Sequence, residues 1–265
     1  MRNVAVITGG SSGIGLATAR IFAEHGYTVY ELSRKGHGEG EIRHITADVS
    51  DFSSVEAALR QVYEAEGRLD VLVNNAGFGI SGAVECTDPA DIRKLFDVNV
   101  FGMVYCIQCA VPYMRETGGG HIVNLSSVAA PLSIPFQAFY SCTKAAVSDL
   151  TLALANELRP FHISVCAVMP GDIRTGFTEA RKKCAAGGAF YGTAIERSVL
   201  LMERDEKNGM PPEAVARRVF VAAGKKHPKP LYAVGAKYKL FVVTARLLPV
   251  RFTNWVVGIL YASTK

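Results

Sequence analysis

Short apolar runs and helix-like segments alternate along nearly the whole of this 265-residue chain. Most of the apolar runs are continuous, so both faces of each strand must be covered by other parts of the fold. A parallel sheet with helices on both faces satisfies that requirement. The sequence therefore predicts an α/β fold, a doubly wound parallel sheet of seven strands. The strands are expected at residues 3–8, 28–32, 42–46, 70–74, 121–126, 163–168 and 231–234.

The expected helices lie between those strands, at 14–26, 52–66, about 89–115 and about 136–158. No linker, low-complexity tract or internal repeat divides the chain. Residues 1–265 are therefore expected to form a single domain, since this length is within reach of one large α/β fold.

Composition argues against several classes of protein. Charged residues make up 20% and the net charge is only +5, spread along the chain, so no nucleic-acid partner is expected. The first strand begins by about Asn3, which leaves no room for a signal peptide. The six cysteines show no spacing typical of a disulfide framework. A cytoplasmic location is therefore expected. Cys106 and Cys109 form a CxxC motif inside an apolar helical stretch. We expect both to be buried structural thiols, and we expect no metal site there. No uncharged apolar run has the length of a membrane span.

The glycine-rich segment TGGSSGIG, residues 8–15, follows the first strand and indicates a phosphate site. Its spacing fits the start of a nucleoside-triphosphatase loop, but Leu16 and Ala17 stand where that loop needs Lys and Ser or Thr. A dinucleotide site remains, in which glycines admit the pyrophosphate and the next helix supplies free amide donors. A tight turn without a ligand is the alternative that this motif alone leaves open. Residues 77–82 match the G-x-G-x-x-G pattern more closely, but they follow the fourth strand and are not interpreted as the pyrophosphate turn.

Tyr140 and Lys144 are four residues apart at the start of a predicted helix, so they share one face. Ser127 ends the fifth strand, at the sheet edge where ligands of such folds bind. A phenol has a reference pKa of about 10, and a nearby ammonium together with an oxidised nicotinamide would lower that pKa. Tyr140 could then exchange a proton with an alcohol or ketone. Singly, each of these residues would more often be structural.

Taken together, the motifs resemble the short-chain dehydrogenase/reductase family. TGGSSGIG, NNAG at 74–77, VNVFG with Asn99, YSCTK and PGDIRT at 170–175 occur in the family's order and spacing, over nearly all of residues 3–235. The resemblance implies a Rossmann fold and an oxidoreductase with a catalytic set of four residues. In that set Tyr140 is the acid/base, and Ser127 rather than Ser126 binds the substrate oxygen. Lys144 lowers the pKa of the tyrosine and binds the nicotinamide ribose. Asn99 holds a proton-relay water.

The cofactor is expected to be NADP(H). Relatives that use NAD have an acidic residue at the end of the second strand, where this chain has Ser33. Arg34 and Lys35 follow it and could bind a 2′-phosphate. Glu31, the nearest acid, falls two residues early and nearer the sheet than the ribose. The resemblance implies that the carboxylate of Asp48 accepts a hydrogen bond from the adenine amine. Asn74 is expected to tie neighbouring strands together. The expected cofactor-binding residues are Gly9, Ser11, Ser12, Gly13, Ile14, Gly15, Ser33, Arg34, Lys35, Asp48, Val49, Asn75, Ala76, Gly77, Tyr140, Lys144, Pro170, Gly171, Ile173 and Thr175.

Residues of about 176–210 would form the family's substrate lid. The chain looks most like the 17β-hydroxysteroid and retinol dehydrogenases, which implies a bulky apolar ketone or alcohol as substrate, steroid-, bile-acid- or retinoid-like. A 3-ketoacyl-type or general carbonyl reductase is the alternative, and a non-catalytic NADP-binding sensor is an alternative of another class. The expected substrate-binding residues are Ser127, Phe136, Tyr140, Phe177 and Tyr191.

The resemblance also implies a homodimer or homotetramer, joined through the long helices at about 89–115 and 136–159. Residues of about 236–265 form an extension beyond the last strand, in which Lys237, Lys239, Arg246 and Arg251 alternate with large apolar residues. Such a pattern can rest on a membrane surface, but contact with its own domain or a partner subunit is the favoured expectation.

Overall fold

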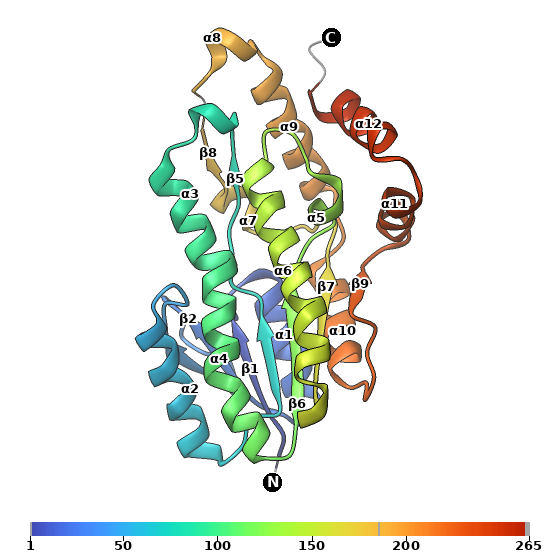
Figure 1. Cartoon of the computed structure of the whole chain (residues 1–265). Coiled ribbons are helices and arrows are strands. Elements are labelled where there is room, and N and C mark those ends of the chain that lie inside the picture. Colours follow the sequence, from blue (N-terminus) through green and yellow to red (C-terminus); the bar gives the residue numbers. More distant parts are fainter. Residues whose placement is uncertain (1, 185, 263–265) are drawn as a thin grey trace.

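The computed structural model of this protein describes residues 2–184 and 186–262. Seven strands, all paired in parallel, form one sheet in the order β3-β2-β1-β4-β6-β7-β9 (Figure 1). The predicted doubly wound sheet is therefore confirmed, and each predicted strand boundary is correct to within one residue. The strands are β1 (Val4–Thr8), β2 (Thr28–Ser33), β3 (Ile42–Thr46), β4 (Val71–Asn74), β6 (Gly120–Leu125), β7 (Ile163–Met169) and β9 (Leu231–Ala233).

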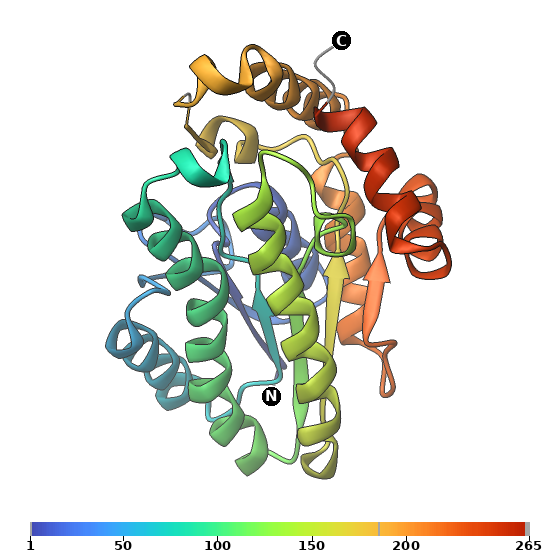
Figure 2. The same cartoon turned by 45° about the horizontal axis from the view of Figure 1, so that its top comes forward.

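Helices cover both faces of the sheet (Figures 1 and 2). Neighbouring residues of a strand point to opposite faces. In β1, Val4 and Val6 accordingly enter one core, whereas Ala5 and Ile7 enter the other. The first core is closed by α2 (Phe52–Glu66), α4 (Gly102–Glu116) and α6 (Ala138–Glu157), and the second by α1 (Gly13–Glu24) and α10 (Pro212–Ala223).

The long helix predicted over about 89–115 has three parts. A π-helical turn, η2 (Asp97–Phe101), joins α3 (Pro89–Phe96) to α4. Asn99 lies in that turn, and π-helical turns occur most often at functional sites. Among the described residues, Pro89–Glu116 is the helix long and apolar enough to cross a membrane, but half of its apolar window is buried within the fold. We therefore interpret it as a core helix.

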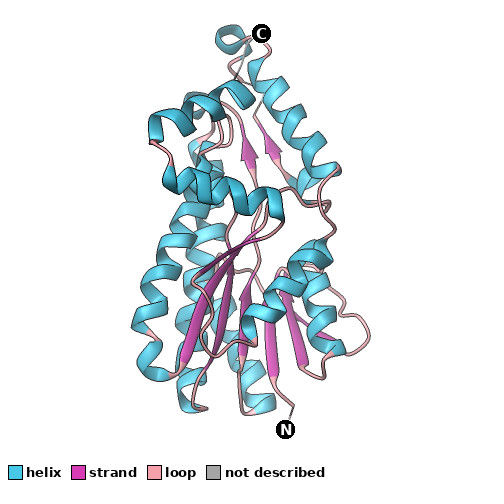
Figure 3. Cartoon of the chain, turned by 90° about the vertical axis from the view of Figure 1, so that its right-hand side faces the viewer, coloured by secondary structure: helices cyan, strands magenta, loops and turns pink. Residues whose placement is uncertain are grey.

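A second layer lies beyond the carboxyl ends of the main strands. Here β5 (Ile80–Ser81) pairs in parallel with β8 (Lys182–Lys183), so the loop after β4 is joined to the predicted lid (Figures 1 and 3). The remaining elements of the described chain are η1 (Val84–Cys86), α5 (Ala129–Leu132), η3 (Arg159–Phe161), α7 (Phe177–Ala180), α8 (Gly188–Tyr191), α9 (Ala194–Lys207), α11 (Ala236–Leu247) and α12 (Val250–Ala262).

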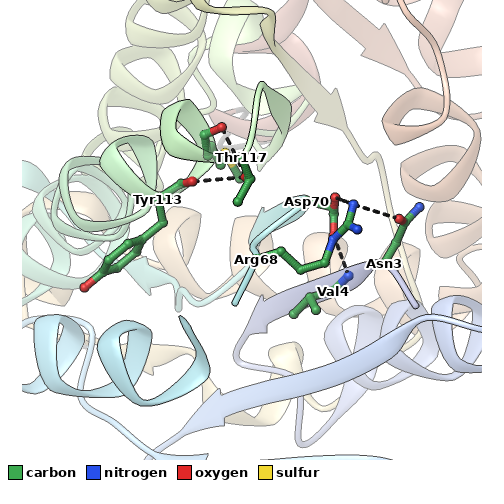
Figure 4. A network of polar contacts seen from close by, with 7 residues as sticks. Asn3, Val4, Arg68, Asp70, Tyr113 and Thr117 are labelled. Atoms are coloured by element: carbon green, nitrogen blue, oxygen red, sulfur yellow. Dashed lines mark hydrogen bonds and ion pairs between the residues drawn. The ribbon is translucent and has the colours of Figure 1, made fainter. Parts of the chain in front are cut away.

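Hydrogen bonds fix the opposite end of the sheet, where β1 and β4 begin (Figure 4). Asp70 accepts from the backbone N–H of Val4 at 2.7 Å and from Arg68 Nη2 at 2.6 Å. The same Arg68 nitrogen donates to Asn3 Oδ1 at 3.2 Å. At the end of α4, the carbonyl of Tyr113 accepts from the Thr117 hydroxyl at 3.1 Å and from the Thr117 backbone N–H at 3.2 Å.

Candidate active site

The glycine-rich turn after β1 can exist only with glycines at several of its positions. Gly9 and Gly13 have φ of +64° and +54°, the left-handed region that side chains rarely adopt. A Cβ on Gly15 would lie 2.2 Å from the Gly9 carbonyl oxygen, and one on Gly10 would lie 2.5 Å from Glu31 Cβ. Ser12, the N-cap of α1, makes no side-chain cap, so the first amides of that helix keep their donors. This bare, electropositive helix start fits a cofactor pyrophosphate.

The other predicted cofactor segments come together around this turn. Thr175 faces Gly13, because a Cβ there would lie 3.4 Å from the Thr175 Cβ. Asn75 Nδ2 donates to the carbonyl oxygens of Thr8 at 2.9 Å and Gly9 at 3.1 Å. The segments that begin at Pro170 and Asn75, far apart in sequence, therefore line one edge of the sheet.

The roles expected for Asn74 and Asp48 can be compared with their contacts. Asn74 Nδ2 donates to Asn124 Oδ1 at 2.9 Å and so joins β4 to β6, as predicted. Asp48 is not the cap of α2, because Asp51 caps it. Asp48 instead accepts from the backbone and hydroxyl of Ser50 at 3.0 and 2.6 Å. Burial acts to raise its pKa, but the bonds from Ser50 hold the pKa below its ordinary value, so a carboxylate is available.

The end of β2 presents two free cations. Arg34 and Lys35 are exposed, and within the described chain neither makes a hydrogen bond or ion pair. Glu31 is 2% exposed and binds His44 Nδ1, with its Oε2 buried and unpartnered. Glu31 was expected nearer the sheet than the ribose, but it lines one pocket with Ser11 and Lys35. Glu31 therefore lies closer to the cofactor site than its sequence position implied.

Ser126 and Ser127 point in different directions from the end of β6. Ser126 Oγ donates to the carbonyl of Lys144 at 2.8 Å, which ties β6 to α6. Ser127 Oγ accepts from the backbone of Ala129 at 3.1 Å and lies close enough to the phenol of Tyr140 to lower its pKa. Only Ser127 therefore lies where a group bound to Tyr140 would meet a second hydroxyl.

Burial dominates the titration of the central pair. It raises the pKa of Tyr140 to about 12, with the hydrogen bond from Ser127 opposing it. It lowers the pKa of Lys144 to about 8. Lys144 Nζ lies 5.6 Å from the centre of the Tyr140 ring. Lys144 is not among the groups that shift the pKa of Tyr140, which burial of the phenol dominates. The lowering expected from Lys144 together with an oxidised nicotinamide stays a prediction.

Asn99 holds the loop after β4 rather than pointing into open space. It is 2% exposed, and its Nδ2 donates to the carbonyl of Phe78 at 3.0 Å and to Thr143 Oγ1 at 3.2 Å. Its Oδ1 accepts from the Phe78 backbone at 3.0 Å. Both Nδ2 donors are therefore used, which leaves one lone pair of Oδ1 and the Asn99 backbone as places for a relay water.

The three predicted substrate-site aromatics other than Tyr140 lie in two places. Phe177 lies against the catalytic centre, 5.6 Å from the Tyr140 ring. Phe136 and Tyr191 contact each other edge to face at 5.7 Å. They belong to a separate apolar cluster under α9, which also contains Ala83, Ile195, Val199, Met202 and Tyr261.

Sequence reasoning missed two charged lid residues beside Phe177. Arg181 is buried and forms an ion pair with Glu206. In the sequence they are ordinary members of a lid rich in charged residues, and no local pattern separates them from their exposed neighbours.

The CxxC is part of the core. Cys106 is buried, which raises the pKa of its thiol to about 12, and Cys109 is half-buried. The described residues contain no group of three or more His, Cys, Asp or Glu side chains placed to hold a metal ion.

Comparison with known proteins places this geometry in a family context. The short chain dehydrogenase family model matches residues 3–185. A 3-ketodihydrosphingosine reductase from Bacteroides thetaiotaomicron is 38% identical over 263 residues, which cover 98% of each chain. A crystal structure of a short-chain dehydrogenase from Streptomyces avermitilis has a TM-score of 0.83 and 31% identity, covering 100% of this chain and 99% of that one.

Similar structures contain both nicotinamide cofactors. A short chain dehydrogenase/reductase from Burkholderia phymatum, in complex with NAD, is 27% identical with a TM-score of 0.80 and covers 93% of this chain and 92% of its own. ElxO with NADP bound is also 27% identical, with a TM-score of 0.74 and coverage of 91% and 100%. The fold thus accepts either cofactor.

Proposed function

This chain belongs to the short-chain dehydrogenase/reductase family of oxidoreductases, and we propose that it uses NADPH to reduce the ketone of a bulky, largely apolar substrate. The observation that carries the proposal is the joint position of Ser127, Tyr140 and Lys144 beside a glycine turn built for a pyrophosphate. A nicotinamide cofactor supplies the hydride in such a site; the protein must supply a proton and hold the carbonyl.

Tyr140 is the proton donor in this proposal. With a pKa of about 12 the phenol is protonated at neutral pH, which suits an acid that protonates the oxygen of a ketone as it becomes an alcohol. Ser127, which lies beside the same phenol, supplies a second hydroxyl for that oxygen. Two donors aimed at one developing oxyanion stabilise the transition state more than the neutral carbonyl.

Lys144 is assigned to the cofactor ribose. Its Nζ donates one hydrogen bond to the Leu125 carbonyl at 2.8 Å, so two donor positions of the ammonium are left for hydroxyl groups. Asn99 is assigned a positioning role, since its side chain fixes Phe78, and its backbone or one lone pair of Oδ1 is left to hold the expected relay water.

NADP(H) is proposed over NAD(H) because the end of β2 offers Arg34 and Lys35 without partners. A guanidinium can bind a 2′-phosphate through two parallel hydrogen bonds. Glu31 is the competing residue, because its free oxygen could accept from a ribose hydroxyl and would repel that phosphate. His44 already binds the other carboxylate oxygen and holds Glu31 against β3, whereas Arg34 and Lys35 stay exposed, which supports the choice of NADP(H).

The substrate class is proposed from the relative and the lid. The relative of 38% identity reduces, by its name, a ketone on a sphingoid base, which is a long-chain amphiphile. The apolar cluster under α9 suits a chain of that kind as well as a steroid or retinoid.

We also propose that the protein is a cytoplasmic homo-oligomer. The alternative of another class is a sensor that binds NADP without turnover.

The test is NADPH oxidation, followed at 340 nm, with a panel of long-chain keto-sphingoid bases, ketosteroids, oxidised bile acids, retinal and small diketones. We expect turnover of a long-chain ketone, faster with NADPH than with NADH, and none with the Tyr140→Phe protein. Tight NADPH binding with no turnover of any member would support the sensor instead.

A further inference from the structure

Arg181 is buried in the lid with hydrogen-bond donors that nothing satisfies. Its side chain is 0% exposed, and Nη2 binds Glu206 Oε1. Nε and Nη1 are buried without a partner among the described residues. An unsatisfied buried donor destabilises the folded protein, and more so on a charged group, so such an arrangement calls for an explanation.

The free donors lie beside the catalytic phenol. The guanidinium carbon of Arg181 is 5.7 Å from the centre of the Phe177 ring, which is 5.6 Å from the ring of Tyr140. A Cβ on Gly79 would lie 3.6 Å from Arg181 Nε and 3.1 Å from the tip of Phe177. Arg181, Phe177 and Gly79 therefore pack against one another beside Tyr140. In agreement, both Arg181 and Glu206 act on the pKa of Tyr140, Glu206 raising it and Arg181 lowering it.

The charge of Arg181 is already balanced. Glu206 accepts from Arg181 through Oε1 and from the Thr178 hydroxyl through Oε2, the latter at 2.6 Å. A second anion here would leave one buried charge without compensation, which is costly in a dry site. A neutral acceptor would satisfy the free donors without changing the net charge.

We propose that Arg181 binds a neutral oxygen substituent of the substrate, a hydroxyl or carbonyl close to the reacting ketone. The inference rests on the proposed ketone reduction and narrows its substrates to ketones with a nearby oxygen function. Phe177 and the cluster under α9 then contact the apolar remainder of the molecule. Substrates are thus selected by a polar contact at the reacting end.

The test compares a long-chain hydroxy ketone with the same ketone lacking the hydroxyl. The wild-type protein is expected to show at least a tenfold higher kcat/KM for the hydroxy ketone, because donors left unpaired by the plain ketone weaken its binding. Arg181→Met with Glu206→Gln, which removes both charges together, should abolish that preference. Arg204→Met, an exposed arginine of α9, is the matched control and should keep the preference.

A binding readout separates this inference from the proposed function. Quenching of bound NADPH fluorescence by each ketone measures selectivity even without turnover. No reduction of either ketone would contradict the proposed function, yet tighter binding of the hydroxy ketone that is lost in the double variant would still support the Arg181 site. Equal selectivity in wild type and double variant, or no selectivity in wild type, would overturn it. Circular dichroism confirms that the variants are folded.

A second inference comes from α11 and α12, which expose an unusual amount of apolar surface. Leu247 and Val250 are 78% and 79% exposed, and Trp255 is 60% exposed. We call the exposed large residues of these helices the C-terminal apolar face. They are Leu240, Phe241, Val243, Leu247, Leu248, Val250, Phe252, Trp255, Ile259 and Leu260.

These two helices are firmly attached on their other side. Tyr238 of α11 covers Gly171, where a Cβ would lie 2.3 Å from its ring, and donates to Asp172. Tyr261 of α12 joins the apolar cluster under α9, so α12 lies beside the lid (Figure 2). The fold has therefore used one side of each helix and left the C-terminal apolar face uncovered.

The charge around this face has one sign. After Glu213 the sequence contains no Asp or Glu, whereas Lys237, Lys239, Arg246 and Arg251 lie on or beside the two helices and are exposed. Apolar side chains with a basic surround match a membrane surface that carries anionic lipids. A second copy of the face would bring like charges together, which disfavours self-association.

We infer that the C-terminal apolar face rests on an anionic membrane, which places the lid at the bilayer where an apolar substrate would dissolve. This reverses the expectation that the extension only contacts protein. The inference does not depend on which ketone is reduced.

Trp255, the only tryptophan of the chain, reports on the face directly. With vesicles containing about a third of phosphatidylglycerol we expect a blue shift of its emission and co-sedimentation, both weakened by salt and weak on pure phosphatidylcholine. Leu247→Glu with Val250→Glu should abolish both, whereas Val221→Glu, an exposed apolar residue on α10, should not. A wild-type protein that stays in the supernatant with unshifted emission would overturn the inference. So would a double variant that only halves the oligomeric mass and still binds vesicles.

Discussion

The ammonium of Lys144 donates a 2.8 Å hydrogen bond to the carbonyl of Leu125, the last residue of β6. This bond links the helix that carries Tyr140 to the strand that leads into Ser127. The groups proposed to hold the substrate oxygen are therefore fixed to each other through Lys144 as well as through their own contact.

Tyr140→Phe should lower turnover at least a thousandfold, because the variant lacks the proposed proton donor. The ring remains, and so does its contact with Phe177. NADPH affinity, measured by fluorescence, should change by less than threefold. Turnover within tenfold of wild type would show that another group supplies the proton.

Ketone reduction should lose rate as pH rises through about 8. Below that pH both groups are protonated, since Lys144 has a pKa of about 8 and Tyr140 one of about 12. Above it Lys144 loses the charge that holds the ribose, while Tyr140 is still an acid. The profile of kcat/KM measures these free-protein groups. Lys144→Arg should move the fall to higher pH, and a wild-type profile flat to pH 10 would contradict the assignment.

Arg34→Ala should weaken NADPH binding tenfold or more, because a hydrogen bond to a charged group contributes about 1.5–3 kcal/mol. NADH lacks the 2′-phosphate and should bind almost unchanged. The two dissociation constants decide the matter. If wild type prefers NADH, Glu31 is the selecting residue, and Glu31→Gln should then weaken NADH instead.

Gly15→Ala should destabilise the fold by roughly 2–3 kcal/mol and remove cofactor binding, because its Cβ would overlap the Gly9 carbonyl. The matched control is Gly258→Ala in α12, where a Cβ meets nothing within 4 Å. That change should stabilise by about 0.5–1 kcal/mol. Thermal melts with and without NADPH compare the two, and a Gly15→Ala protein that still gains stability from NADPH would refute the account.

The protein should be a dimer or tetramer through α4 and α6, the helices proposed from family resemblance. Light scattering should then give a multiple of 28.5 kDa. Leu152→Glu, on the exposed part of α6, should reduce that mass, whereas Val221→Glu on α10 should not. A wild-type mass of 28.5 kDa at working concentration would exclude this assembly.

The sheet could be predicted from the sequence because its signal is local. A continuous run such as VAVIT must be covered on both faces, and that requirement depends on residues next to one another. The ends of the strands then identify the ligand edge, so Ser127 and the glycine turn could be assigned to it without coordinates. Asn74 was likewise placed correctly as a link between strands.

The titration of the site and the partners of its charges depended on tertiary structure. The spacing of Tyr140 and Lys144 predicts a pair on one helix face, but it does not encode the depth of burial that raises the pKa of Tyr140. Arg181 and Glu206, 25 residues apart, are paired by the fold of the lid. The sequence determined which residues line the ligand edge, since strand order and helix phase follow from short-range pattern. Only the tertiary structure decided which of them are buried away from water, which are paired with an opposite charge and which have no partner. Desolvation and charge pairing depend on every segment that folds over these residues.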